Sequence, residues 1–234
     1  MVSSPFGGID GVDSELLRSV LEQLEIDLAG KQILDVGCGR GFAAELVREA
    51  GGDYTGIDFV RSRGGFRLAL GDAANLPCAD ESVDGVFCVD AFEHFPEPDR
   101  AAAEIRRVLR PGGFFYLSAP NYANTAGVVK WVYEELGIYE RNTWAPFGRW
   151  QAQELETPLT GHMVKRIFHG AGFGRIRRIG HGPEVGLGLF PWIDHGKMPE
   201  AIQFRLQGFF RRVGPPIARV WPGASLHNFW KMEV

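Results

Sequence analysis

Cysteine is scarce in this sequence of 234 residues, and no long apolar run is present. The three cysteines, at positions 38, 78 and 88, are odd in number, and two lie in or next to predicted strands, which argues against a disulfide framework. No stretch of 18 apolar residues occurs, so no transmembrane helix is expected. The first residues lack a basic segment followed by an apolar one, so no signal peptide is expected either. These absences predict a location in the reducing cytoplasm.

Two common nucleotide-binding signatures are also missing. No Gly-Lys-Ser/Thr follows a glycine-rich loop, which excludes a Walker-type phosphate loop. The dinucleotide fingerprint Gly-x-Gly-x-x-Gly is incomplete, because the glycines occupy positions 37, 39 and 41 and position 42 is phenylalanine. Aromatic and basic residues are not interleaved as in single-strand binders, and no nucleic-acid-binding motif is found. We therefore expect no nucleic-acid partner.

The charge is unevenly distributed along the chain. The formal net charge is −4, but from Gly161 onward eleven Lys or Arg residues stand against four Asp or Glu residues. A solvated basic face explains this excess, and so does a surface for an acidic substrate or an anionic lipid.

What the sequence does contain is the segment ILDVGCGRG, residues 33–41. It begins with a β-prone apolar run and continues into alternating glycines. Residues 42–50 then show apolar side chains at helical spacing. A strand, a glycine-rich turn and a helix in this order favour a nucleotide site, because glycine allows close backbone approach and a helix N-terminus offers free N–H groups.

The rest of the chain alternates between predicted helices and strands. Helices are expected at residues 14–28, 42–50, 99–109, 128–136, 160–170 and 200–213. Strands are expected at residues 33–36, 54–58, 66–70, 85–89, 114–118, 173–179 and 225–234. The last helix is predicted to stop at Pro215-Pro216, and residues 59–65 are too few for an ordinary helical crossover. This order predicts an α/β fold with a Rossmann-like, doubly wound sheet, mainly parallel with an antiparallel last strand.

We expect residues 1–234 to form a single domain. Its core would comprise residues 30–120 and 160–234, with an insertion at about 121–159 that is helical in part, irregular and aromatic. Because parallel sheets bind ligands at the carboxyl ends of their strands, this insertion is interpreted as a lid over that edge. An elaborated surface loop packed on the core is the alternative.

Four motifs in a fixed order resemble the class I S-adenosylmethionine-dependent methyltransferases, in the subgroup that includes ubiquinone and menaquinone methylases. They are ILDVGCGRG (33–41), GID (56–58), GDAANLPCADESVDGVFCVDAFEHF (71–95) and EIRRVLRPGGFFYLSAPN (104–121), with a weaker echo in TGHMVKRIFHGAGF (160–173). The resemblance implies that S-adenosylmethionine is bound and is converted to S-adenosylhomocysteine. The residues expected to contact this cofactor are Asp35, Gly37, Gly39, Asp58, Phe59, Asp72, Ala73 and Asp90.

The carboxylates have individual roles in this hypothesis. Asp58 lies 21 residues after Gly37 at a strand end and can accept both ribose hydroxyls, or cap a loop instead. Asp72 can accept the adenine amino group while the N–H of Ala73 serves a ring nitrogen, and a turn aspartate is the alternative. Asp35 can orient the ammonium of the amino-acid tail, or bond N–H groups of its own loop. Gly37 and Gly39 let the backbone approach that tail, and Asp90 is expected beside the sulfonium end.

His94 is the candidate general base, since it follows the strand where this fold brings acceptor and methyl group together. The alternative is that Glu93 holds the loop and His94 caps the next helix. Tyr122, Tyr139, Trp144 and His162 are expected to contact the acceptor. Asp90, Glu93 and His94 can also be arranged as a divalent metal site, but their spacing is not diagnostic and no metal is expected.

The acceptor is predicted from the aromatic lid and the basic last third of the chain. We expect O-methylation of a hydroxyl on a small metabolite, either a saccharide or a polyketide-like molecule, which can carry an anionic group. The alternative is C-methylation of a quinone or another prenylated aromatic. A protein that binds the cofactor without catalysis is the more distant alternative.

Overall fold

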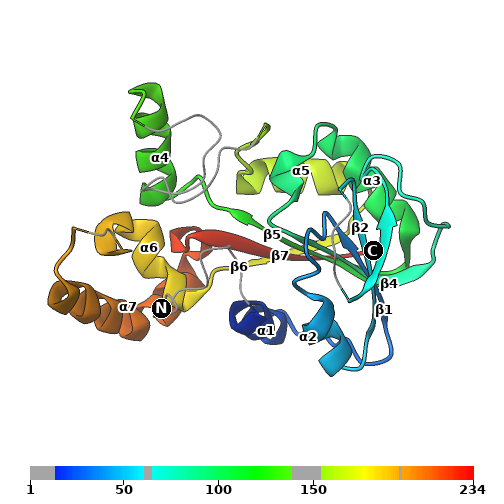
Figure 1. Cartoon of the computed structure of the whole chain (residues 1–234), viewed down its shortest axis with the longest axis horizontal. Helices are drawn as coiled ribbons and strands as arrows, with labels where there is room; N and C mark the ends of the chain where they lie inside the picture. Colours follow the sequence, from blue (N-terminus) through cyan, green and yellow to red (C-terminus); the bar gives the residue numbers. More distant parts are fainter. Residues whose placement is uncertain (1–13, 61–64, 139–153, 195–196) are drawn as a thin grey trace. The chain divides into compact units, whose positions relative to one another are not determined.

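The computed structural model describes residues 14–60, 65–138, 154–194 and 197–234 (Figure 1). Seven α-helices are found in these ranges: α1 (Ser14–Gln23), α2 (Ala44–Glu49), α3 (Pro98–Val108), α4 (Thr125–Glu135), α5 (Gly161–Gly170), α6 (Val185–Leu189) and α7 (Glu200–Val220). The strands of the same ranges are β1 (Gln32–Val36), β2 (Asp53–Asp58), β3 (Arg67–Leu70), β4 (Val83–Val89), β5 (Leu109–Pro120), β6 (Arg175–Ile179) and β7 (His227–Glu233). Short 3-10 helices are η1 (Phe92–His94), η2 (Gly182–Glu184), η3 (Pro191–Asp194) and η4 (Pro222–Ala224).

The strands form one seven-stranded sheet in the order β3-β2-β1-β4-β5-β7-β6. The pairs β1–β2, β2–β3, β1–β4 and β4–β5 are all parallel. β7 runs antiparallel to β5, because the N–H of Val234 donates to the carbonyl of Gly113 whereas the N–H of Asn121 donates to the carbonyl of Leu226. The predicted fold class is therefore confirmed. The chain adds β2 and β3 on one side of β1 and then β4 and β5 on the other, so the ends of the parallel strands β1 and β4 form the topological switch point where such folds bind ligands.

The chain divides into two compact units. The first comprises Met1–Ser118, Gly161–Arg177 and Trp230–Val234, and the second comprises Ala119–Thr160 and Arg178–Phe229. Within the first unit, α3 and α5 lie on one face of the sheet and α1 and α2 on the other (Figure 1). The single domain with a lid at about 121–159 remains a prediction.

The core of the first unit is aromatic where α5 meets the sheet. The rings of Phe115 and Phe168 have centroids 5.0 Å apart, and Phe92 lies 5.1 Å from Phe168. Phe173 completes the cluster at 5.5 Å from Phe168. All four side chains are at most 2% exposed, so they anchor the loop after β4 as well as the sheet.

The second unit packs closely around glycines. A Cβ on Gly214 of α7 would lie 2.0 Å from the carbonyl oxygen of Gly182, and one on Gly182 would lie 2.7 Å from the backbone of Pro215. A small apolar core joins Val185, Ala218 and Ala224. Within the described ranges, no helix has both the length and the apolar character needed to cross a membrane.

Three predicted boundaries are wrong, for physical reasons. The helix expected over residues 14–28 ends at Gln23, because Glu25 takes a left-handed backbone conformation with a φ of +56°. α7 does not stop at Pro215-Pro216 but continues to Val220, because Gly214 packs against Gly182 before the prolines and Ala218 packs against Val185 after them. β5 begins at Leu109, not at Phe114, since Leu109 already takes extended backbone angles and pairs with Val83. A register shift between Val83 and Gly85 accommodates the Pro-Gly-Gly segment inside the strand.

Candidate functional site

The glycine loop after β1 is fixed to the end of β2. The N–H groups of Gly37 and Cys38 both donate to the carbonyl oxygen of Ile57, at 2.8 and 3.2 Å. Gly37 has a φ of +76°, and a Cβ there would lie 2.6 Å from the Cβ of Ala91, so only glycine fits. Gly39 differs: its φ is +51°, yet a Cβ there would meet no atom within 4 Å. The loop therefore packs against Ala91 at Gly37, whereas it borders open space at Gly39.

Asp35 is buried directly beneath this loop, with 2% of its surface exposed. The Tyr54 hydroxyl donates to its Oδ2 at 2.6 Å, whereas Oδ1 has no hydrogen-bond partner among the described residues. Burial raises the pKa of Asp35 to about 7; the Tyr54 hydrogen bond opposes this rise, and the charge of Asp58 adds to it. A buried carboxylate oxygen without a donor is unfavourable unless a ligand supplies one. A positively charged N–H donor, directly or through water, would satisfy this oxygen.

The Cys38 thiol lies in the same acidic surroundings. Burial first, and then the charges of Asp35 and Asp58, raise its pKa to about 12. The thiol is therefore protonated at neutral pH and is not a nucleophile. Its role is steric, because a Cβ on Gly56 of β2 would lie 2.5 Å from its Sγ.

Asp58 joins the end of β2 to the glycine loop. Its Oδ2 accepts the N–H of Gly39 at 2.8 Å, and its Oδ1 accepts the N–H of Val60 at 3.0 Å. The predicted loop-capping role is thus present. An ionised carboxylate has about four acceptor positions, so these two bonds leave capacity for the hydroxyl pair of a ribose.

Asp72 forms a turn after β3. Its Oδ1 accepts the N–H of Ala74 at 2.9 Å, and its carbonyl oxygen accepts the N–H of Asn75 at 3.0 Å. Asp72 thus closes a turn, which is the alternative that the sequence offered for this residue, and Ala73 lies within the turn. Phe59, after β2, is 84% exposed and has its ring available to a flat ligand.

Asp90 follows β4 in a left-handed conformation, with a φ of +46°. Its N–H lies 3.1 Å from the Ser118 Oγ, and the Ser118 hydroxyl donates back to Asp90 Oδ1 at 2.8 Å. This reciprocal pair holds a strained residue where β4 and β5 end together. Sequence reasoning missed Ser118, although a lone serine in the apolar run FFYLS was the available signal.

His94 and Glu93 occupy the short helix η1. The Glu93 side chain is 2% exposed and the His94 side chain 33%, and His94 Nε2 lies 4.0 Å from Glu93 Oε1. The backbone of the turn is closed by the N–H of His94 donating to the Ala91 carbonyl at 3.0 Å. Across the described parts of the chain, no group of three or more His, Cys, Asp and Glu side chains is placed to hold a metal ion.

The residues predicted to contact an acceptor belong to different units or lie outside the described residues. His162 is exposed in the first turn of α5, in the first unit. Tyr122 belongs to the second unit, where Lys130 Nζ lies 5.0 Å from its ring centroid. Tyr139 and Trp144 lie outside the described residues. The structure thus brings together the glycine loop, Asp35 and Asp58, with Asp72 and Asp90 at the ends of neighbouring parallel strands.

Comparison with known proteins agrees with this geometry. Residues 34–117 match the family described as "Methyltransferase domain". The chain is 40% identical over 103 residues to a phthiotriol/phenolphthiotriol dimycocerosates methyltransferase of Mycobacterium tuberculosis, and 38% identical over 105 residues to a fatty-acid O-methyltransferase of Mycolicibacterium smegmatis. Each match covers 39% of this chain and 38% of the relative, so the chain matches well under half the length of these curated relatives.

The fold is also found among solved structures. A SAM-dependent methyltransferase from Archaeoglobus fulgidus superposes with a TM-score of 0.63 at 17% identity, over 97% of this chain and 95% of that one. At this identity the likeness concerns the fold. The fold, the motif order and the family match over residues 34–117 are thus all similar to those of class I S-adenosylmethionine-dependent methyltransferases.

Proposed function

We propose that the protein transfers a methyl group from S-adenosylmethionine to an oxygen atom of a small acceptor of lipid or polyketide character. The observation that carries the cofactor part is the buried Oδ1 of Asp35, which has no donor among the described residues. The ammonium of the cofactor's amino-acid tail is a donor of the required charge, and a phosphate is not.

The other residues of the site fit the same ligand. The open face at Gly39 leaves room for the amino-acid tail against the backbone. Asp58 would accept the ribose hydroxyls, and the Asp72–Ala73 turn with Phe59 would border the adenine. When bound, the sulfonium supplies an electrophilic methyl group whose leaving group is neutral. The protein therefore has to position the acceptor and remove its proton.

We assign proton removal to His94. Its imidazole is partly exposed, as a group that receives a proton from a bound acceptor must be, while Glu93 behind it is buried at 4.0 Å. The Asp90–Ser118 pair fixes the strand ends next to this loop, so it positions His94 without touching the transferred proton.

The acceptor class rests on two kinds of support. Relatives of this domain carry the names of a fatty-acid O-methyltransferase and of a methyltransferase for dimycocerosates, both of which describe long apolar molecules. The second unit also presents apolar side chains to solvent, among them Val128 and Trp131 on α4, at 55% and 62% exposure. A saccharide acceptor, the other class expected from the sequence, could also stack on Trp131 but does not explain the names of these relatives.

The experiment has two parts. Calorimetry with S-adenosylhomocysteine measures cofactor binding, and incubation with methyl-labelled cofactor and a panel of hydroxy fatty acids, fatty acids, polyketides, sugars and quinols is followed by NMR of the products. Label on oxygen of an apolar acceptor supports the proposal. Label on carbon of a quinol, label on a sugar, or binding without any transfer would each reject it.

A further inference from the structure

Helix α7 is packed against its unit by one side only. Gly214 and Ala218 are its buried residues, and Phe210 and Ile217 pack with Val185 in the small core of that unit. These positions recur at intervals of three, four and seven residues and define the inward side of the helix. The packing of α7 is therefore satisfied without its remaining aromatic and aliphatic side chains.

Those remaining side chains are exposed. Phe204 is 78% exposed, Phe209 56%, Ile202 50% and Val220 86%. An isolated exposed apolar residue needs no explanation, but Ile202, Phe209 and Val220 lie within about 20° of one another around the helix and form a stripe that lacks a partner in the described chain, whereas Phe204 lies on the opposite flank. α7 is the long helix at the end of the second unit, drawn in brown and orange in Figure 1.

α7 also carries exposed arginines, of which Arg205, Arg212 and Arg219 lie on the outward side of the helix and Arg211 on another flank. Arg205, Arg211, Arg212 and Arg219 are all exposed, and α7 contains one acidic residue, Glu200. Among the described residues none of these four arginines forms an ion pair. In the first unit, by contrast, Arg107 bonds both Asp80 and Glu104. The positive charge of α7 is therefore not used within its own unit.

The two kinds of side chain form parallel stripes. Arg205, Arg212 and Arg219 are seven residues apart, which keeps them on one line of an α-helix. Ile202 and Phe209 follow the same interval, rotated by roughly 60° from the arginines at 3.6 residues per turn. With 21 residues α7 is about 30 Å long, so the stripes extend over several lipid headgroups.

We propose that the outward face of α7 binds the surface of a bilayer that contains anionic phospholipids. Arginines would contact lipid phosphates while Ile202 and Phe209 enter the boundary between headgroups and acyl chains. An anionic bilayer matches both the positive charge and the apolar stripe of α7. A neutral protein surface lacks the negative charge, and so does a second copy of this basic helix. The proposal involves no residue of the cofactor site and does not depend on the proposed methyl transfer.

The test is co-sedimentation of the full chain with two kinds of vesicle. One contains phosphatidylcholine alone and the other includes roughly 30 mol% phosphatidylglycerol. We expect binding to the anionic vesicles only, with loss of most binding at about 0.5 M salt. The variant Arg205→Gln/Arg212→Gln/Arg219→Gln should reduce the partition coefficient on the order of 100-fold, since each arginine contributes about tenfold or less near such a surface.

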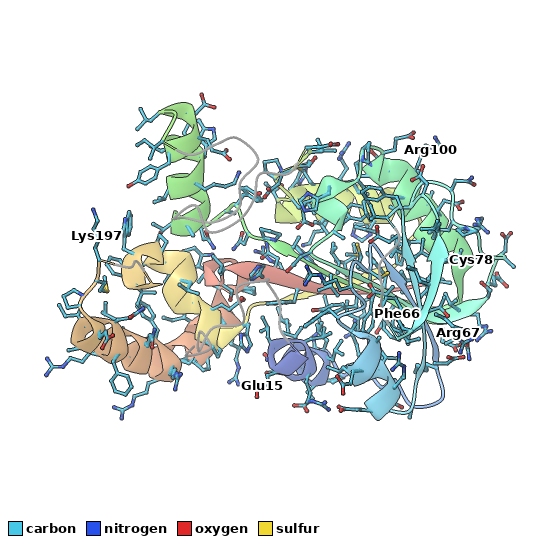
Figure 2. All side chains as sticks on the ribbon, in the orientation of Figure 1. Glu15, Phe66, Arg67, Cys78, Arg100 and Lys197 are labelled. Atoms are coloured by element: carbon cyan, nitrogen blue, oxygen red, sulfur yellow. The ribbon has the colours of Figure 1, made fainter. Side chains whose placement is uncertain are left out.

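A matched control removes the same charge elsewhere. Arg67, Arg100 and Arg175 have side chains that are 68%, 63% and 75% exposed in the first unit, and Figure 2 shows Arg67 and Arg100 at its surface. Their triple Gln variant should bind anionic vesicles within about threefold of the parent, because the lost charges lie outside α7. Equal losses in both variants would show that only net charge matters and would overturn the proposal.

The apolar stripe requires its own variant. Ile202→Ser/Phe209→Ser keeps every arginine and should still weaken binding by about tenfold or more. Unchanged binding by this variant, binding to neutral vesicles of equal strength, or a dimer in light scattering that the same substitutions abolish while vesicles are not bound, would each reject a membrane-facing role. S-adenosylhomocysteine binding by the variants, measured in parallel, separates these outcomes from failure of the cofactor site.

Discussion

Replacing Asp35 with asparagine should make the cofactor-free protein more stable and its cofactor binding weaker. Folding raises the pKa of this carboxyl from 3.8 to about 7, so the folded state favours the protonated form. The contribution of Asp35 to the free energy of unfolding is therefore fully present below about pH 4 and is lost as the pH rises through about 7. The difference between 3.8 and about 7 corresponds to about 4 kcal/mol.

Asparagine removes the buried charge and keeps an oxygen for the Tyr54 hydroxyl. Burying its amide NH₂ without a partner costs about 1–3 kcal/mol, so the net gain in unfolding free energy at pH 8 should be about 2 kcal/mol. Loss of a charge-assisted contact to the ammonium should weaken S-adenosylhomocysteine binding about 10- to 100-fold. Urea denaturation without ligand and calorimetry with ligand measure the two effects separately.

The pH dependence of binding provides the control. In the parent protein the dissociation constant should rise about tenfold for each pH unit below 7, because Asp35 must be ionised to bind a cation. The asparagine variant should show little dependence over the same range. A parent protein whose affinity is constant from about pH 5 to pH 7, or an Asp35→Asn variant with unchanged affinity, would contradict the role given to this carboxylate.

Four other substitutions test the remaining parts of the site. Gly37→Ala should destabilise the fold by about 2–4 kcal/mol in urea denaturation, since its Cβ would lie 2.6 Å from Ala91 Cβ at a positive φ. Gly39→Ala should cost only about 1 kcal/mol in the same assay but abolish calorimetric binding, because the new methyl group enters open space meant for the ligand. Ser118→Ala should lower kcat more than KM and reduce stability by about 1 kcal/mol through loss of the bond to Asp90. His94→Ala should lower kcat about 100-fold or more with S-adenosylhomocysteine affinity intact, and full turnover in that variant would remove His94 as the base.

The parts of the site that are local in sequence were predictable. The glycine loop and Asp58 lie on consecutive strand ends, and parallel pairing of β1 with β2 necessarily brings such ends together. The hydrogen bond from Tyr54 to Asp35 was missed because it depends on register between strands. An acidic residue inside an apolar strand requires a hydrogen-bond donor. The sequence therefore indicates that Asp35 needs such a donor, but not which residue supplies it.

Elements whose ends depend on distant packing were predicted less well. The proline pair in α7 is a strong local signal for the end of a helix. The sequence does not reveal the packing against Gly182 that accompanies the continuation of α7 beyond these prolines. The start of β5 likewise depends on pairing of Leu109 with Val83, which overrides the Pro-Gly-Gly segment that follows. Both errors arise where tertiary contacts outweigh local propensity.

The hydrogen bonds of the glycine loop also bear on which ligands the site excludes. In phosphate-binding loops the backbone N–H groups point at the ligand. Here the N–H groups of Gly37 and Cys38 are occupied by the Ile57 carbonyl, and that of Gly39 by the Asp58 carboxylate. Two acidic side chains, Asp35 and Asp58, further lower the electrostatic potential at this position. A nucleotide carrying a pyrophosphate would meet these occupied donors and negative charge, so we expect the loop to bind NAD and ATP poorly.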